Sequence, residues 1–431
     1  MSLFLAVPFA LAAAAAGSGP ALAPLDSIYP DLETLYRDLH ASPELSLQEE
    51  KTSAKLAERF RALGYEVTER VGGFGVVAVM KNGAGPTVLV RADMDALPVE
   101  EKTGLPYAST VKATDSEGNT VPVMHACGHD VHMTSLVGAA TLLARARERW
   151  RGTLVLVGQP AEEAGNGALK MLSDSFLARF PKPDYCLALH DDATLRAGTL
   201  GWTSGWALAN VDSVDVTVFG RGGHGSKPEG TVDPVVIAAR TVVALQTIVA
   251  RENSPFDPAV VTVGSIHGGT RRNVIPDHVT LQLTVRSYKP EVRQRLLAAI
   301  ERIAKGEAVA AGAPREPEVK VLDGTAATYN DPTLSKRVAS ALAGAFGAER
   351  VLEVPPIMAG EDFGEFGKAA DAPSFMFWVG GVPAAKLAEV QGDTSKLPSL
   401  HSALWAPDPE PTLKAGAAAL TVGVLELLGR K

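Results

Sequence analysis

TVLVRADMD, residues 87–95, joins a short apolar run to two acidic residues, Asp93 and Asp95. Stretches with helical spacing of apolar residues separate it from similar apolar runs at residues 75–80, 153–157, 185–189 and 374–379. Strands that alternate with helices in this way are typical of a doubly wound sheet. The sequence therefore predicts an α/β fold with a mostly parallel central sheet.

Helices are expected wherever apolar residues recur at helical spacing. The first spans residues 31–63, and Gly64 follows it as a helix-ending glycine would. Further helices are expected over residues 132–149, 168–180, 233–251, 291–304, 332–346 and 410–428.

A second pattern begins near Ala207. Residues 211–219 and 279–286 alternate apolar and polar side chains, as half-buried antiparallel strands do. Together with two of the expected helices they predict a small α+β module inserted into the larger domain. The sequence thus predicts a signal peptide over residues 1–23 and an inserted module over residues 207–320. The large domain is expected in two parts, residues 24–206 and 321–431.

The first 23 residues contain an apolar run, LFLAVPFALAAAAA, followed by small residues with Ala-x-Ala sites near Ala16 and Ala23. This pattern is typical of a secretory signal and predicts a periplasmic or secreted protein. No Lys or Arg precedes the run, which leaves a cytoplasmic protein as the alternative. The run is shorter than the roughly 20 residues of a membrane span, and no other segment qualifies, so no stable span is expected.

Charge and cysteine content exclude other classes of protein. The net charge is -8 and Lys and Arg are dispersed, so the chain has no basic stripe and no nucleic-acid partner is expected. The two cysteines, Cys127 and Cys186, are too few for a disulfide scaffold in a chain of 431 residues.

Side chains suited to metal binding follow three of the apolar runs, where an open α/β sheet places its ligands. They are Asp93 and Asp95, Glu162 and Glu163 in TLVLVGQPAEE, and His190 in CLALH. The segment MHACGHDVH adds Cys127 and His129, residue types that bind zinc-like ions. His125 and His132 in the same segment are not expected to be ligands.

Glu162 and Glu163 are adjacent, and adjacent side chains of an extended segment point in opposite directions. One carboxylate is therefore expected to bind metal while the other faces the substrate. A free carboxylate beside water activated by metal is suited to general-base catalysis.

Eight motifs occur in one order, RADMDALP, MHACGHDVH, GQPAEE, LALH, GRGGHG, RRNVIPD, GEDF and LHSAL. Over residues 35–428 the chain resembles the M20 metallopeptidases, in particular the N-acyl-amino-acid amidohydrolases that include hippurate hydrolases and auxin-conjugate hydrolases. The resemblance implies a hydrolase that deacylates N-acyl amino acids. It also implies a di-metal catalytic domain interrupted by a lid domain that forms a homodimer.

The resemblance assigns five metal ligands, with a bridging cysteine first: Cys127, His129, Glu163, His190 and His401. Glu162 matches the general base, and Asp95 matches an acidic residue that orients a ligand imidazole. In relatives without the cysteine a histidine ligand replaces Asp93, so Asp93 is not assigned as a ligand. The set suits two divalent ions, with zinc favoured over manganese, cobalt and nickel.

Three residues of the inserted module match substrate-contacting positions. His224 in GRGGHG matches a histidine that reaches the active site of the partner subunit and stabilises the developing oxyanion. Asn273 and Arg286 fall where the lid meets the substrate, although both are also suited to supporting the strands of the lid. Val131, Asp191-Asp192 and Lys227-Pro228-Glu229 depart from the usual motifs and affect the expected substrate preference.

Two other functions remain open at this point. A carboxypeptidase or dipeptidase that acts on short peptides would use the same di-metal centre. A non-catalytic metal-binding module would keep the ligands and lose the general base, whereas Glu162 is present. Zinc deamination is disfavoured because the Pro-Cys-x-x-Cys motif is absent.

Overall fold

The computed structural model describes residues 19–429, which form two compact units. The larger unit contains the chain up to Ala207, Tyr329–Pro355 and the chain from Asp362 onward. The smaller unit contains Leu208–Thr328 and Pro356–Glu361. Most of the predicted signal peptide, residues 1–18, lies outside the described residues.

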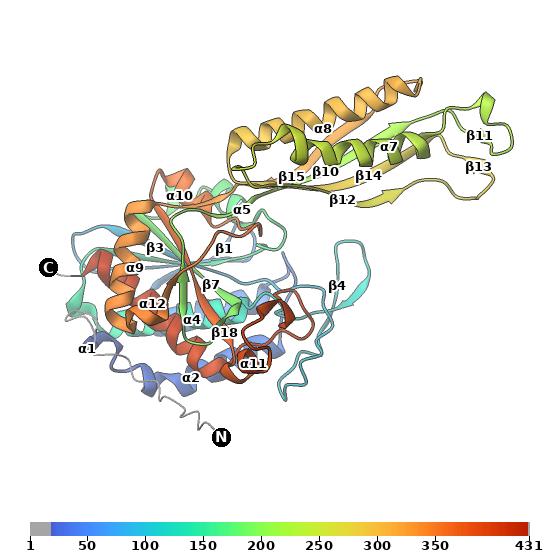
Figure 1. Ribbon diagram of the computed structural model, residues 1–431. Helices are drawn as coiled ribbons and strands as arrows, with labels where there is room; N and C mark the ends of the chain where they lie inside the picture. The colour runs from blue at the N-terminus through green and yellow to red at the C-terminus, as the bar shows by residue number, and fades with distance from the viewer. Residues whose placement is uncertain (1–18, 430–431) are drawn as a thin grey trace. The chain divides into compact units, whose positions relative to one another are not determined.

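An eight-stranded sheet forms the centre of the larger unit, in the order β1-β2-β6-β3-β7-β18-β8-β17 (Figure 1). In that order the strands are Glu66–Val71, Gly75–Lys81, Thr153–Gln159, Thr87–Asp93, Tyr185–Arg196, Ser374–Val382, Leu200–Trp202 and Val351–Glu353. The four central strands, β6, β3, β7 and β18, run parallel. Strands β2 and β8 pair antiparallel with the outer members of this group, β1 is antiparallel to β2, and β17 is parallel to β8. The predicted α/β class with a mostly parallel sheet is confirmed.

Long helices pack together beside this sheet. Helix α4 (His129–Arg145) lies along α12 (Pro409–Leu428), and α2 (Leu25–Ala41) contacts both. Gly138 of α4 allows the close approach, because a Cβ there would lie 2.6 Å from the Cβ of Ala417. The buried side chains of these helices and of the sheet form one hydrophobic core, which holds the site-bearing strands in place.

The segment expected as one helix over residues 31–63 is two helices. Helix α2 ends at Ala41 and α3 spans Glu50–Ala62. Pro43 explains the break, because proline has no backbone N–H to donate and biases the preceding residue away from helical angles. Each helix buries one apolar face, so the helical spacing of apolar residues continues from one helix into the next. That spacing therefore could not reveal the break.

Two helices have the length and composition of a membrane span, Pro234–Glu252 and Pro409–Leu428. The expectation that no segment qualifies was therefore wrong by that criterion. Pro409–Leu428 is almost entirely buried inside the larger unit, as the core helix of a folded domain would be. Pro234–Glu252 buries one face only, in the smaller unit.

The smaller unit is an antiparallel sheet in the order β12-β14-β10-β15 with two helices packed on it. The strands are Ala259–His267, His278–Ser287, Asn210–Phe219 and Glu318–Thr325, and the helices are α7 (Pro234–Thr247) and α8 (Pro290–Ala310). Side chains of β10 alternate between buried and half-buried, as the sequence pattern predicts. The predicted boundary at residue 320 falls within β15, whose alternation was not recognised.

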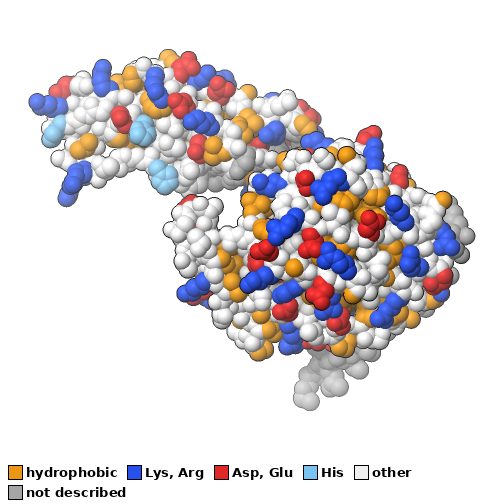
Figure 2. All heavy atoms as spheres, turned by 180° about the vertical axis from the view of Figure 1, so that it is seen from behind, with side chains coloured by type: hydrophobic (Ala, Val, Ile, Leu, Met, Phe, Trp, Pro, Cys, Tyr) orange, Lys and Arg blue, Asp and Glu red, His pale blue; other side chains and the backbone are white. Residues whose placement is uncertain are grey.

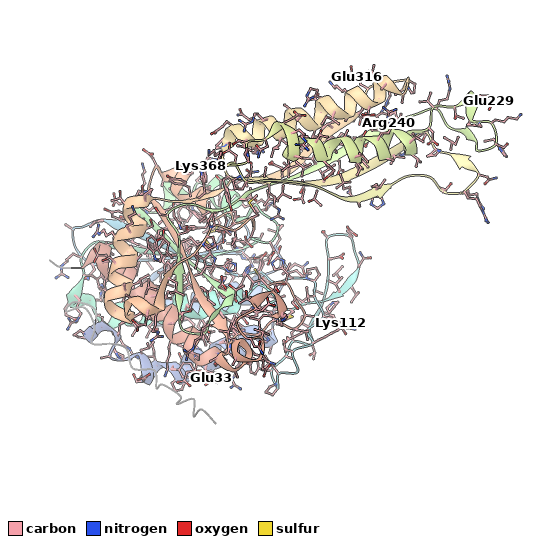
Figure 3. All side chains as sticks on the ribbon, viewed as in Figure 1. Glu33, Lys112, Glu229, Arg240, Glu316 and Lys368 are labelled. Atoms are coloured by element: carbon pink, nitrogen blue, oxygen red, sulfur yellow. The ribbon has the colours of Figure 1, made fainter. Side chains whose placement is uncertain are left out.

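The remaining α-helices and strands are short, apart from α9. They are α1 (Gly19–Leu22), β4 (Lys112–Thr114), β5 (Thr120–Pro122), α5 (Gly167–Ser173), α6 (Phe176–Arg179), β9 (Gly205–Leu208), β11 (Gly223–His224), β13 (Val274–Ile275), β16 (Thr328–Asn330), α9 (Pro332–Phe346), α10 (Gly364–Ala370) and α11 (Ala384–Glu389). Strands β11 and β13 pair with each other at one end of the smaller unit, the end where Glu229 lies in Figure 3.

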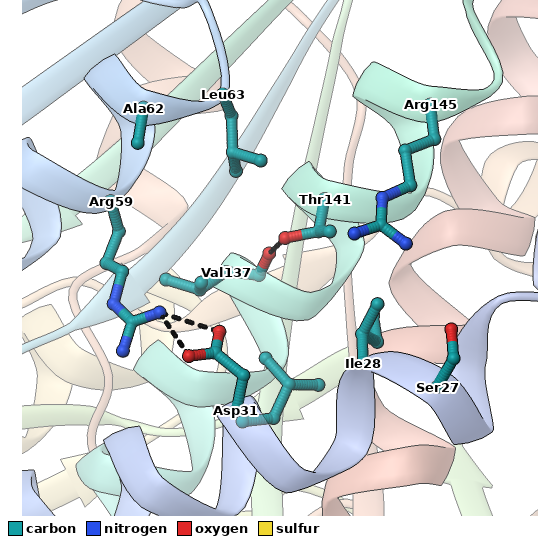
Figure 4. A pocket seen from close by; sticks show the side chains of 10 residues that line it. Ser27, Ile28, Asp31, Arg59, Ala62, Leu63, Val137, Thr141 and Arg145 are labelled. Atoms are coloured by element: carbon teal, nitrogen blue, oxygen red, sulfur yellow. Dashed lines mark hydrogen bonds and ion pairs between the residues drawn. The ribbon is translucent and has the colours of Figure 1, made fainter.

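The surface has no single-sign region on the face seen in Figure 2, where Lys and Arg are interspersed with Asp and Glu. A hollow between α2, α3 and α4 is lined by residues that include Asp31, Arg59 and Arg145 (Figure 4). No predicted site residue lines it.

Candidate metal centre

The structure brings the five predicted metal ligands together in the larger unit. Cys127 lies directly before α4, and His129 is its first residue. His190 lies within β7, and Glu163 follows the carboxyl end of β6. His401 comes from the loop before α12. Since β6 and β7 both pair with β3, the parallel sheet places their acid and histidine at one edge.

The thiol of Cys127 lies at the centre of this group. Its Sγ is 3.6 Å from His190 Nε2 and 3.2 Å from His401 Nε2. His401 Nε2 is also 3.4 Å from Glu163 Oε1. Two sets of potential ligand atoms, each within 4.8 Å of one another, share this sulfur: Cys127, His129 and His190, and Cys127, Glu163 and His401. Two sets that share this sulfur would offer ligand atoms to two ions.

The orientation of the imidazoles also fits metal ligation. His129 Nδ1 is 2.7 Å from the backbone oxygen of Asp95, and His190 Nδ1 is 2.7 Å from the backbone oxygen of Asp191. A histidine that donates one ring N–H to the protein offers the other nitrogen to a metal. His129 Nε2 and Glu163 Oε1 are buried without a hydrogen-bond partner among residues 19–429. Buried polar atoms without partners are uncommon, and a cation between them would satisfy both.

The electrostatics of the site favour a bound cation. Burial, and then the charges of Glu163 and Glu162, raise the pKa of the Cys127 thiol well above its usual value. A thiolate therefore needs positive charge beside it, which divalent ions supply. Burial alone would lower the pKa of His129, but Asp93 and Asp95 outweigh burial and raise it to about 9.

Asp93 and His132 form a support beside the ligands. Asp93 Oδ2 accepts a hydrogen bond from Arg91 (2.6 Å), and Oδ1 lies 2.6 Å from His132 Nδ1. The backbone N–H of Asp191 donates to His132 Nε2 (2.8 Å), so His132 carries its proton on Nδ1 and donates it to Asp93. Both oxygens of Asp93 and both nitrogens of His132 have partners within the protein. Asp93, His129 and His132 also offer ligand atoms within 4.8 Å of one another. His125 is buried, and burial lowers its pKa to about 4.

Glu162 and Glu163 lie in a turn rather than in an extended segment. Glu162 Oε2 is 3.8 Å and Glu163 Oε1 is 3.9 Å from the same atom, His129 Nε2. The expectation that the two side chains point in opposite directions was wrong, because it applied strand geometry to a turn. Both carboxylates face the metal centre from the same side of His129.

Asp95 supports this turn. Its Oδ1 accepts the N–H of Glu162 (3.1 Å), and its Oδ2 accepts the N–H of Glu163 (3.0 Å). Its carboxylate lies 3.4 Å from His129 Nδ1, whereas its backbone oxygen lies at 2.7 Å. The backbone of Asp95 thus orients the ligand imidazole, and its carboxylate orients the two glutamates.

The three predicted substrate-contacting residues belong to the smaller unit. His224 is exposed in β11, and its Nδ1 accepts a hydrogen bond from the N–H of Ser226 (3.1 Å). Asn273 is exposed, and its backbone oxygen accepts the N–H of Gly225 (2.9 Å). Arg286 of β14 donates to the backbone oxygen of Met358 (2.7 Å), within the same unit. Arg286 therefore holds the segment Pro356–Glu361 rather than a strand of the lid.

Sequence reasoning missed a buried polar network beneath the site. The Arg91 side chain has no exposed surface and donates to Asp93, to Gln159 Oε1 (2.8 Å) and to Asp362 Oδ1 (3.2 Å). Trp405 donates its ring N–H to Asp191 Oδ2 (3.0 Å). An arginine inside the apolar run TVLVRAD was a visible signal, because buried charges are rare unless paired. No local signal marks Trp405.

Comparison with known proteins assigns the family. The model of peptidase family M20/M25/M40 matches residues 89–394, so the chain belongs to this family. The chain is a metal-dependent hydrolase that acts on amide bonds, which confirms the resemblance drawn from the motifs.

Several relatives match most of the chain. An N-acetyl-L-cysteine deacetylase of Bacillus subtilis is 38% identical, over 79% of this chain and 78% of the relative. A hippurate hydrolase of Campylobacter jejuni is 38% identical, over 78% and 85%. A thermostable carboxypeptidase 2 of Saccharolobus solfataricus is 36% identical, over 80% and 84%.

A solved structure extends the likeness to the whole fold. A dinuclear metal binding peptidase from the M20 family of Bacillus subtilis has a TM-score of 0.74 and 30% sequence identity. The alignment covers 94% of this chain and all of that one. A dinuclear centre in that relative agrees with the two ligand sets found here.

Proposed function

We propose that this protein removes the acyl group from N-acyl amino acids, using two divalent ions held by Cys127, His129, Glu163, His190 and His401. The observation that carries the proposal is the pair of ligand sets sharing the Cys127 sulfur, with Glu162 beside them. Among the relatives, the N-acetyl-L-cysteine deacetylase and the hippurate hydrolase support an acyl-amino-acid substrate.

Ions bound at this centre would supply the Lewis acidity that makes water a nucleophile at neutral pH. Glu162 accepts the proton of the attacking water on its carboxylate and returns it to the leaving nitrogen. Asp95 holds the backbone of Glu162 in place during both transfers. His224 of the partner subunit donates to the oxygen of the scissile carbonyl, with Asn273 beside it in the lid.

The thiolate, three imidazoles and one carboxylate of this ligand set favour zinc, with manganese, cobalt and nickel as alternatives. To distinguish these metals, turnover is measured for the protein as isolated and again after it has been stripped and reloaded with each metal in turn. We expect zinc to restore turnover, and restoration by manganese alone would overturn the zinc assignment.

A panel of N-acyl amino acids and dipeptides tests the reaction. We expect the wild type to release acids from N-acetyl or N-benzoyl amino acids, and Glu162→Gln to retain two ions while losing most of its turnover. Glu58→Gln, at an exposed position on α3, is the matched control and should keep wild-type rates. Full activity of Glu162→Gln would remove this residue from the mechanism.

A carboxypeptidase or dipeptidase activity is the second candidate, supported by the similarity to thermostable carboxypeptidase 2. Faster cleavage of unblocked or carboxyl-terminal peptide bonds than of acyl amino acids in the same panel would select it. Stoichiometric metal binding without turnover on any substrate would select a non-catalytic metal-binding module.

We further propose that the protein is a homodimer formed through the smaller unit. Helix α7 exposes Val236 and Val243, with 54% and 71% of their surfaces accessible, although buried positions are usual for valine. Exposed apolar side chains on one helix face are typical of an interface. Light scattering should give a dimer for the wild type and a monomer for Val243→Glu. A monomeric wild type would contradict this proposal.

Export to the periplasm or the exterior is proposed from the signal-like first residues. Cleavage near Ala16 fits better than cleavage near Ala23, because Ala21 and Leu22 are 2% and 4% exposed in the core of the larger unit. The intact mass of the mature protein tests this site. An uncleaved protein in the cytoplasm would support the alternative location.

A further inference from the structure

The segment between α2 and α3, Ser42–Glu49, lies against the strand ends that carry the metal centre. The N–H of Ala96 donates to the backbone oxygen of Glu44 (2.8 Å). The hydroxyl of Ser46 donates to Asp95 Oδ2 (2.6 Å). The segment between the two helices therefore brings polar groups into contact with Asp95, whose carboxylate accepts the N–H groups of Glu162 and Glu163.

Glu49 ends this segment, and its side chain is completely buried. Its Oε1 accepts two backbone N–H groups, from Leu47 (2.9 Å) and from Ala161 (2.8 Å). Its Oε2 is buried without a hydrogen-bond partner among residues 19–429. Burial, and then the charge of Asp95, raise the pKa of Glu49 to about 7. A buried carboxylate in such surroundings is costly, which calls for an explanation of its presence.

Ala161 explains what Glu49 does. Its φ is 52°, a left-handed conformation that is unfavourable for a residue with a Cβ. Ala161 is fully buried, so its N–H would have no water to bond if Glu49 were absent. The bond to Glu49 Oε1 satisfies that N–H and holds the turn in its unusual conformation.

Glu162 and Glu163 follow Ala161 directly, and their N–H groups donate to Asp95. Three consecutive backbone N–H groups are thus held by two buried carboxylates, Glu49 and Asp95. Asp95 holds the backbone of the two glutamates, and Glu49 holds the backbone of Ala161, the residue directly before them. A displacement of the turn at Ala161 would rotate both glutamates away from His129.

We propose that Glu49 is a positioning residue, which fixes the turn at Ala161 so that the carboxylate of Glu162 faces the water that it deprotonates. The role rests on the proposed function, because it matters only if Glu162 is the base. What Glu49 supplies is an acceptor atom at one place, rather than charge.

Two substitutions separate position from charge. Glu49→Gln keeps the chain length and an acceptor oxygen but removes the charge. Glu49→Asp keeps the charge but withdraws the oxygens by one methylene. We expect Glu49→Gln to keep kcat within about threefold, whereas Glu49→Asp should lower kcat by about 10- to 100-fold at unchanged KM and two ions per chain.

Glu44→Asp is the matched control. Glu44 also accepts backbone N–H groups, from Lys51 (3.2 Å) and Thr52 (2.8 Å), but these lie at the start of α3 and not in the turn. This variant should keep the kcat of the wild type. A loss of kcat equal to that of Glu49→Asp would show that the segment acts only through general stability and would overturn the proposal.

Amide hydrogen exchange gives a readout that does not depend on activity. Glu49→Asp should speed exchange of the amides at residues 161–163, and Glu49→Gln and Glu44→Asp should not. Unchanged exchange and kcat in Glu49→Asp would overturn the positioning role, and so would equal losses in Glu49→Gln and Glu49→Asp. Wild-type protein without turnover on the panel would instead refute the proposed function, while the exchange experiment still decides whether Glu49 holds the turn.

Discussion

His40 is held between two buried carboxylates, and its removal should destabilise the larger unit strongly. Its Nδ1 lies 2.7 Å from Asp130 Oδ2 and its Nε2 lies 3.0 Å from Glu101 Oε1. No more than 1% of any of the three side chains is exposed. We expect His40→Gln, which keeps polar atoms but cannot be charged, to leave two buried carboxylates without a cation.

The size of the effect follows from the pKa of His40. Burial alone would lower this pKa, but the hydrogen bonds to Asp130 and Glu101 outweigh burial and raise it from 6.5 to about 10. A shift of that size corresponds to roughly 5 kcal/mol of stability at low pH, and breaking buried ion pairs costs about 3–5 kcal/mol. Because the folded-state pKa is raised, the contribution is complete below pH 6.5 and is lost as the pH rises through 10.

Denaturant unfolding of chelator-treated protein measures this difference. Wild type and His40→Gln should differ by about 3–5 kcal/mol at pH 6, and the difference should shrink as the pH approaches 10. Asp31→Asn is the control, since Asp31 accepts two hydrogen bonds from Arg59 at an exposed site and should cost less than about 1 kcal/mol (Figure 4). A difference below about 1 kcal/mol at pH 6, or one that does not vary with pH, would refute the reasoning.

Two further substitutions test the support of the metal centre. Gly128→Ala adds a Cβ 2.3 Å from Asp191 Oδ2 at a residue whose φ is 74°, so metal analysis should find fewer than two ions and turnover should fall at least about tenfold. Wild-type metal content would contradict this. Arg91→Met leaves Asp93 and Asp362 buried without the guanidinium that pairs with them. Denaturant unfolding should show that the free energy of unfolding falls by about 3–5 kcal/mol. An unchanged unfolding midpoint would count against the network.

Part of the clustering of the five predicted ligands follows from sheet topology. Carboxyl ends of parallel strands meet at one edge, so residues after β6 and within β7 had to lie near each other. Cys127 and His129 flank a glycine before a helix, and His401 was assigned only through the resemblance of its motif. Predicting the ligand set therefore required both the order of the strands and the resemblance of the motifs.

The supports of the site could not be predicted in the same way. Glu49 is an ordinary polar residue within an apparently continuous amphipathic pattern, and only the fold shows that its oxygen meets Ala161. The same holds for the turn at Glu162 and Glu163, since no neighbouring residue signals the left-handed conformation of Ala161. Tertiary packing determines which residues distant in sequence form hydrogen bonds with each other. The periodic pattern of apolar residues carries no information about these pairs.

The number of ions held by the two cysteine variants tests the central claim most directly. Wild type, Cys127→Ala and Cys186→Ala are stripped with a chelator, reloaded with zinc and analysed for metal per chain. Cys186 is also buried but lies in β7 outside the ligand sets, which makes it the matched control. We predict two ions in the wild type and in Cys186→Ala, and no more than one in Cys127→Ala. Two ions in Cys127→Ala, or none in the wild type, would contradict a two-ion centre that depends on this thiol.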